Sequence, residues 1–205
     1  MTTPVLGALI GLGLAEVLVR RRSAGVLLVA AQSLLLGSIA LSEAAGAGGG
    51  LWVAASILLV RALALPVLLW RVIAQTREPR RVASERHGLP RLVVAVVAVL
   101  VTVLLVPRFG LEQAGAEHGA VALVVLGIVI AAVRRPVVFQ AIGFLVAENG
   151  VYLASLSVDG GFPAVIELAL LFDLVVALGV AATFGGKIHE EFGTSDTSIL
   201  GSLRD

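Results

Sequence analysis

Long apolar runs, separated by short polar or basic stretches, cover most of this chain. A transmembrane helix needs about 20 predominantly apolar residues, and seven runs approach or exceed that length: residues 4–19, 24–41, 51–73, 92–106, 120–133, 136–157 and 162–183. The fourth and fifth runs are short, and they cross a bilayer only with flanking residues such as Leu89 or Ala114. The pattern predicts an all-α, polytopic integral membrane protein with about seven transmembrane helices.

Basic residues gather in alternate loops between the predicted spans. They lie in or beside the first, third and fifth loops and after the last span: Arg20, Arg21, Arg22, Arg71, Arg77, Arg80, Arg81, Arg86, Arg91, Arg134, Arg135, Lys187 and Arg204. The other loops carry only Arg108. Because cytoplasmic loops carry an excess of Lys and Arg, we expect the N-terminus outside and the C-terminus in the cytoplasm. The first run ends in arginines where a cleavable signal peptide has small residues, so we expect it to be the first transmembrane helix.

One long polar connection, broken by Pro79, divides the chain. It separates an N-terminal three-helix half, residues 1–73, from a C-terminal four-helix half, residues 92–186. The connection itself, residues 74–91, is predicted to be a cytoplasmic linker, and residues 187–205 are predicted to be a cytoplasmic tail.

The composition excludes several classes of function. Hydrophobic residues make up 59% of the 205-residue chain and charged residues 14%, and a mean hydropathy of +1.04 leaves no room for a soluble domain. The net charge of +1 comes with no basic patch interleaved with aromatics, which excludes nucleic-acid binding. With no cysteine, and with His87, His118 and His189 all in predicted loops or the tail, we expect no metal or other cofactor in this chain.

Two acids, Glu148 and Asp173, lie deep inside the last two predicted spans. At a rise of about 1.5 Å per residue, Glu148 lies roughly 20 Å from Arg135, and Asp173 lies roughly 21 Å from Lys187. Both therefore lie at nearly the same depth in a hydrocarbon layer about 30 Å thick. A charge there costs about 2.5–3.5 kcal/mol on insertion scales, and such residues often relay protons. We predict that Glu148 and Asp173 form a proton relay; the alternative is a protonated carboxyl that only hydrogen-bonds a neighbour.

Arg61 is a cation at comparable depth in the third span, about 15 Å from Arg71. It needs a partner or water, and two interpretations stay open. In the first, Arg61 forms a structural ion pair with Glu148 or Asp173; in the second, it is a fixed charge that tunes their proton affinity.

Five further polar residues have secondary roles in this interpretation. Tyr152 follows Glu148 by one helical turn and is expected to line the same path. Glu167 lies about 120° around the helix from Asp173, so we expect a solvated residue at the mouth of the path. Glu16 and Glu43, near span ends, are interpreted in the same way, and Gln32 is expected to hydrogen-bond between helices.

Several stretches of the chain, taken together, resemble a known family. They are residues 135–156, with Phe144-Leu-Val-Ala-Glu-Asn-Gly150; Val165-Ile-Glu167 followed by Asp173; Asp196-Thr-Ser-Ile-Leu-Gly-Ser-Leu203; and Arg61-Ala-Leu-Ala-Leu-Pro66. These stretches resemble the hydrogenase-4 component E family of membrane subunits. The C-terminal half is also similar to the small K-type subunit of respiratory complex I, which has glutamates in two adjacent helices. The first of these would fall at Leu145, one turn before Glu148, and the second near Asp173.

The resemblance implies a membrane subunit of a hydrogenase- or formate-hydrogenlyase-like complex, multi-pass in the cell inner (plasma) membrane. Its partners would be antiporter-like and other membrane subunits and the lipid bilayer, while nickel–iron and iron–sulfur chemistry would belong to other chains. We expect it to take part in proton translocation without being catalytic itself. Two alternatives stay open: a structural scaffold that joins larger subunits, and an independent small transporter or channel that acts as a homo-oligomer.

Overall fold

The computed structural model describes residues 3–47, 50–75, 88–105 and 114–157, together with Gly179. In this part of the chain, which contains no strand, the helices are α1 (Thr3–Leu18), α2 (Arg22–Ala47), α3 (Gly50–Gln75), α4 (Gly88–Leu105), α5 (Ala114–Val133) and α6 (Val137–Ser155). Each helix coincides with one of the first six predicted spans. The seventh predicted span, residues 162–183, lies outside the described residues apart from Gly179.

The two shortest predicted spans are longer in the structure. α4 begins at Gly88 and α5 at Ala114, so both helices include the flanking residues that a bilayer crossing requires. Four stretches are long and apolar enough to cross a membrane by length and composition: Arg22–Ser42, Gly88–Leu105, Gly115–Val133 and Val137–Ser155. The described part of the chain is therefore all-helical with candidate membrane spans, as the apolar pattern predicted.

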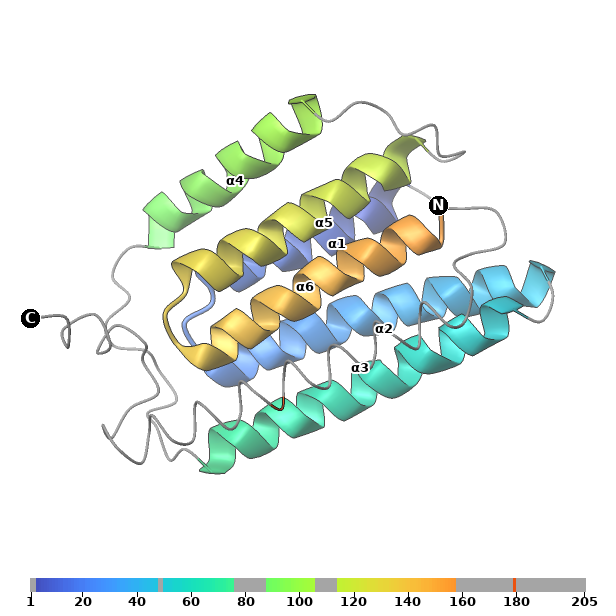
Figure 1. Cartoon of the computed structure of the whole chain (residues 1–205), viewed down its shortest axis with the longest axis horizontal. Coiled ribbons are helices and arrows are strands. Elements are labelled where there is room, and N and C mark those ends of the chain that lie inside the picture. The colour runs from blue at the N-terminus through green and yellow to red at the C-terminus, as the bar shows by residue number, and fades with distance from the viewer. Residues whose placement is uncertain (1–2, 48–49, 76–87, 106–113, 158–178, 180–205) are drawn as a thin grey trace, which may run out of the picture.

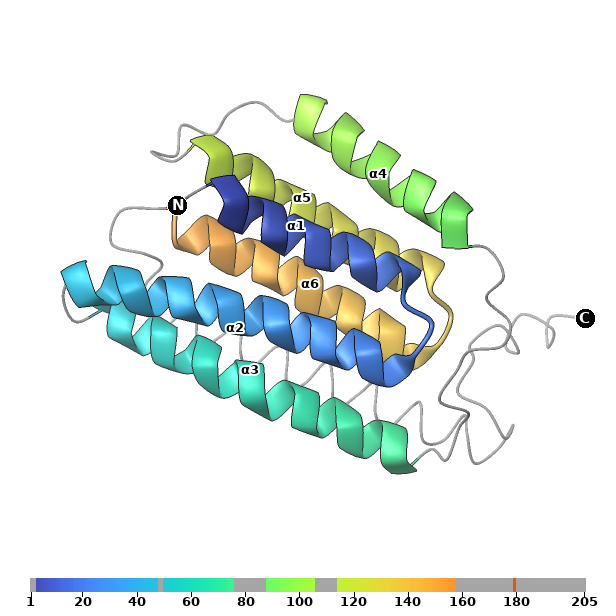
Figure 2. The same cartoon turned by 180° about the vertical axis from the view of Figure 1, so that it is seen from behind.

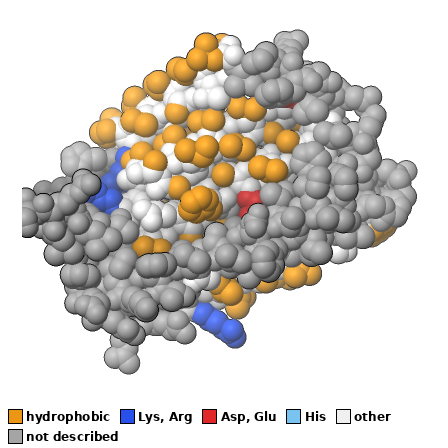
Figure 3. All heavy atoms as spheres, viewed as in Figure 1, with side chains coloured by type: hydrophobic (Ala, Val, Ile, Leu, Met, Phe, Trp, Pro, Cys, Tyr) orange, Lys and Arg blue, Asp and Glu red, His pale blue; other side chains and the backbone are white. Residues whose placement is uncertain are grey.

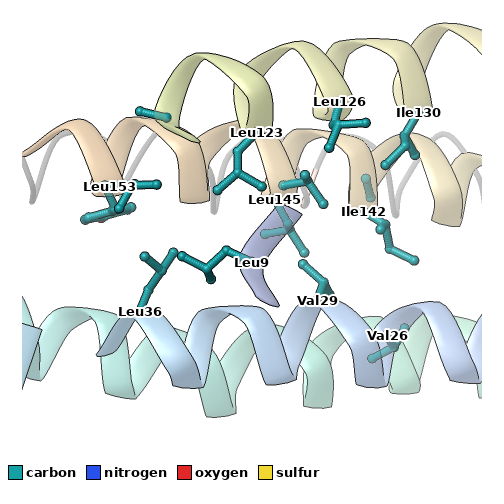
Figure 4. Close-up of a cluster of buried hydrophobic side chains, with 14 of the residues drawn as sticks. Leu9, Val26, Val29, Leu36, Leu123, Leu126, Ile130, Ile142, Leu145 and Leu153 are labelled. Atoms are coloured by element: carbon teal, nitrogen blue, oxygen red, sulfur yellow. The ribbon is translucent and has the colours of Figure 1, made fainter. Parts of the chain in front are cut away.

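Four helices enclose the core, and two flank it. α1 packs against α2 and α5, α2 packs against α6, and α5 packs against α6, whereas α3 lies on the outer side of α2 and α4 lies beside α1 and α5 (Figures 1 and 2). Leu9 of α1, Leu36 of α2, Leu126 of α5 and Leu145 of α6 point into the space between these four helices (Figure 4). The predicted N-terminal and C-terminal halves thus contribute to one hydrophobic core.

The flanking helices carry large apolar side chains on their outer faces. Ala95 is the buried residue of α4, while Leu89, Leu104 and Leu105 of the same helix are among its most exposed residues. Apolar side chains also cover much of the described surface in Figure 3. An apolar surface of this extent suits lipid or a neighbouring membrane subunit better than water.

The turns next to the basic residues meet at one end of the bundle. The α1–α2 and α5–α6 turns, the end of α3 and the start of α4 all lie at the left in Figure 1 and at the right in Figure 2. Arg20–Arg22, Arg71, Arg91 and Arg134–Arg135 belong to these segments. We call this end of the bundle the basic end.

Helices α5 and α6 pack with their backbones in contact. A Cβ added at Gly143 would lie 2.6 Å from the backbone nitrogen of Ala131, and one added at Gly150 would lie 2.6 Å from the carbonyl oxygen of Ala120. Small residues spaced to let two backbones approach are typical of interfaces between membrane helices. This contact fixes how far α6, which carries Glu148, can move along α5.

Candidate functional site

A buried pair of side-chain amides joins α2 to α6 in the middle of the core. The amide nitrogen of Asn149 donates a 2.7 Å hydrogen bond to Oε1 of Gln32, and Nε2 of Gln32 donates a 2.9 Å hydrogen bond to the carbonyl oxygen of Leu9 in α1. Both amide side chains are 0% exposed. The pair therefore ties three helices together without contact with solvent or lipid.

Ser33 extends this pair into a chain of hydrogen bonds with one direction. Its hydroxyl donates to Oδ1 of Asn149 at 3.2 Å, so the donors run from Ser33 through Asn149 and Gln32 to the Leu9 carbonyl. Hydrogen bonds that follow one another in this way polarise each other, and the effect is stronger in a medium of low dielectric constant. We call Ser33, Asn149, Gln32 and the Leu9 carbonyl the amide network.

Gly13 makes room for the amide network on α1. A Cβ added there would lie 3.5 Å from Nε2 of Gln32 and 3.1 Å from a methyl group of Leu126. Gly13 lies one turn after Leu9, the residue whose carbonyl accepts the Gln32 bond. The Cβ of an alanine would be tight against Leu126 and in ordinary contact with the amide, and a longer side chain would press on the amide where it reaches α1.

Glu148 lies next to the amide network in the sequence and is buried with it. It is 8% exposed, and it follows the start of α6 at Val137 by eleven residues, which places it roughly 16 Å from the basic end. Gln32 follows Arg22 by ten residues, about 15 Å. The carboxyl and the amide pair therefore lie at similar depths, about halfway along their helices.

Tyr152 is also buried, one helical turn beyond Glu148. Its side chain is 1% exposed, and the spacing of four residues places it on the same side of α6 as Glu148. Of the predicted site residues, the structure thus places Glu148, Tyr152 and Gln32 inside one bundle, with Gln32 bonded to the neighbour of Glu148.

The remaining predicted site residues fall where the structure gives no side chain. Arg61 lies within α3, but its side chain is outside the described part, and Asp173 and Glu167 belong to the undescribed seventh span. The pairing of Arg61 with either acid, and the relay from Glu148 to Asp173, stay predictions.

Arg134, predicted from the sequence only as a charge beside a membrane span, is buried and joins two helix ends in the structure. Its guanidinium donates to the carbonyl oxygens of Val17 and Val19 at 2.9 and 2.7 Å, and it stacks 3.6 Å from the centre of the Phe139 ring. The last carbonyls of a helix have no partner within the helix and carry partial negative charge. Arg134, which is 1% exposed, therefore caps α1 from the α5–α6 turn. It joins the α1–α2 hairpin to the α5–α6 hairpin at the basic end.

Glu16 differs from its predicted role as a solvated residue at the mouth of the path. Its side chain is 0% exposed, and neither carboxyl oxygen has a hydrogen-bond partner among the described residues. The interpretation from the sequence was wrong because the distance of a residue from a span end does not show whether another helix or turn covers its side chain. The end of α1 lies under the α5–α6 turn, from which Arg134 reaches Val17 and Val19.

Sequence reasoning missed Asn149 and Ser33 as members of the site. Both stand beside residues that were selected, Glu148 and Gln32. An amide next to a carboxyl at mid-membrane was the available signal, because buried amides need partners as much as buried acids do. Among the described residues, no group of three or more metal-ligating side chains comes together.

Comparisons with known proteins add one similarity and no named function. An uncharacterized protein of Mycobacterium tuberculosis, Rv0085, is 29% identical over 160 residues, which cover 73% of this chain and 70% of that protein. No protein-family model matches the chain. No solved structure matches it either.

The amide network predicts energetic coupling between α2 and α6. Gln32→Leu or Asn149→Leu removes the bond between the two amides and leaves one polar group of the remaining amide unsatisfied, so each should lower the free energy of unfolding in detergent by about 1–3 kcal/mol. The double variant should cost less than the sum of the two, with a coupling of about 0.5–3 kcal/mol. Ser38→Ala is the control, because that exposed hydroxyl bonds only within its own helix, to Leu35. Strictly additive effects of the two leucine substitutions would contradict the coupling.

Proposed function

We propose that this chain is a membrane subunit of a hydrogenase- or formate-hydrogenlyase-like complex related to respiratory complex I, and that it takes part in proton translocation. The observation that carries the proposal is the buried amide network beside Glu148, about halfway along α6. The resemblance of residues 135–156 to hydrogenase-4 component E supplies the class of complex.

A carboxyl and two amides inside an apolar bundle suit proton handling. Burying an acid this deep carries a free-energy cost, and acids retained inside membranes mark ion or proton paths. The amide network aligns α6 with α1 and α2, so it holds Glu148 at a fixed depth. Asp173 on the next helix is the proposed acceptor of the proton, and Arg61 is proposed to bias the charge state of both acids.

The proposed setting is the inner membrane, with seven spans and the basic end in the cytoplasm. The apolar outer faces of α3 and α4 support contact with lipid or with antiporter-like subunits. Electron-transferring metals would belong to other chains of the complex.

Cysteine labelling tests the orientation in this cysteine-free chain. Ser84→Cys lies in the linker between α3 and α4, whose adjoining ends are at the basic end, and Ser42→Cys lies on an exposed part of α2, about 30 Å from Arg22. In intact cells an impermeant thiol reagent should label the cysteine at 42 and spare the one at 84, because Lys and Arg face the cytoplasm. Labelling at 84 from outside would overturn the orientation.

Replacing the central acid tests the proposed activity. Glu148→Gln keeps the shape and hydrogen bonding of the side chain but removes its exchangeable carboxyl proton. In vesicles containing the native complex, proton uptake per assembled complex should fall about 100-fold, the scale of losing one proton-transfer group, while assembly is retained.

The matched control is Glu117→Gln, which makes the same change at another buried acid, in the first turn of α5. It should leave proton uptake unchanged. Normal uptake by well-assembled Glu148→Gln complexes would remove the relay and leave the scaffold alternative. Loss of assembly, with normal uptake per remaining complex, would give Glu148 a structural role.

A further inference from the structure

Glu16 is a buried acid that the proposed relay does not use. It lies two residues before the end of α1, is 0% exposed, and has both carboxyl oxygens buried without a hydrogen-bond partner among the described residues. A carboxylate in such a place has no hydrogen bond to offset its lost hydration, whereas a neutral carboxylic acid loses far less. The geometry therefore favours the protonated form of Glu16 in this state of the protein.

The position of Glu16 links the basic end to the amide network. Side chains on a helix lean toward its N-terminus, so Glu16 leans toward Gly13, about one turn away. Gly13 has no side chain, and Nε2 of Gln32 lies 3.5 Å from where its Cβ would be. The face of α1 that carries Glu16 thus leads to the Gln32–Asn149 pair, and Glu148 is the residue that precedes Asn149 in α6.

Two buried arginines lie at the same end of the bundle. Arg134 bonds the carbonyls of Val17 and Val19, immediately after Glu16 in the chain, and Arg22 at the start of α2 is 5% exposed. No ion pair joins Glu16 to either arginine in the described structure, although the Arg134 guanidinium touches the residue next to it. A nearby cation of this kind would stabilise the ionised form of Glu16 once its proton leaves.

We propose that Glu16 is a proton-binding site, which takes protons from the basic end of the bundle and exchanges them with Glu148 along the face held by the amide network. A proton from water binds one carboxyl oxygen of Glu16 and later leaves it, so the step needs no oxidant, reductant or co-reactant. The exchange with Glu148 rests on the proposed function, whereas the proton occupancy of Glu16 does not.

Infrared difference spectroscopy tests the occupancy in the native complex without turnover. At neutral pH, the difference between wild type and Glu16→Gln should contain the carbonyl stretching band of a protonated carboxyl, and this band should shift in D2O. The conservative variant Glu16→Asp should keep a band of this kind. Absence of any such band at neutral pH would show that Glu16 is ionised and would overturn the site.

The thermal unfolding of Glu16→Gln gives a second readout of the same state. Because an amide has nearly the shape and charge of a neutral carboxylic acid, the unfolding midpoint of the complex should stay unchanged. A clearly lowered midpoint would mean that the variant has lost an ion pair, and that result would also overturn the proposal.

Proton uptake separates this site from the relay at Glu148. Glu16→Gln should lower uptake per assembled complex about 100-fold, and Glu16→Asp should restore most of it. Normal uptake by Glu16→Gln would contradict the exchange. If Glu148→Gln pumps normally while Glu16→Gln does not, then the role proposed for Glu148 fails and the site at Glu16 stands.

Discussion

The hydrogen bond between Asn149 and Gln32 is the interaction on which the arrangement of this bundle depends. Apolar contacts between membrane helices are tolerant of sliding, because lipid tails are as apolar as the leucines that they would replace. Two amides buried in the same core oppose such sliding, since each unpaired amide costs about 1–3 kcal/mol. The observed alignment of α1, α2 and α6 satisfies Ser33, Asn149, Gln32 and the Leu9 carbonyl together, and sliding one helix by a turn would break these bonds.

This bond acts more on alignment than on net stability. Hydrogen bonds between membrane helices contribute on average about 0.6 kcal/mol, so the Gln32–Asn149 pair adds little to the apolar packing around it. Its effect is to exclude other registers, and the backbone contact at Gly143 and Gly150 does the same between α5 and α6. The depth of Glu148 is set by both constraints, and Arg134 fixes the basic end by capping α1.

The apolar pattern was enough to predict α1 to α6, because a span is a long local signal that needs no knowledge of its neighbours. It also predicted that the fourth and fifth spans would need flanking residues, which α4 and α5 include. The site was less predictable, since burial depends on what covers a residue. From the sequence, Glu16 near a span end was predicted to be solvated, and Arg134 was predicted to be a membrane-flanking charge. In the structure Glu16 is buried, and Arg134, from the α5–α6 turn, is buried against the end of α1. The partner of Gln32 lay 117 positions away, beyond the reach of any local pattern.

The most direct measurement is an experimental structure of the native complex in a membrane mimetic, at a resolution that shows side-chain amides and carboxyls. We expect Asn149 within hydrogen-bond distance of Gln32, with Glu16 and Glu148 both enclosed by the bundle. Separated amides, or a Glu16 carboxyl that faces bulk water or lipid headgroups, would contradict it.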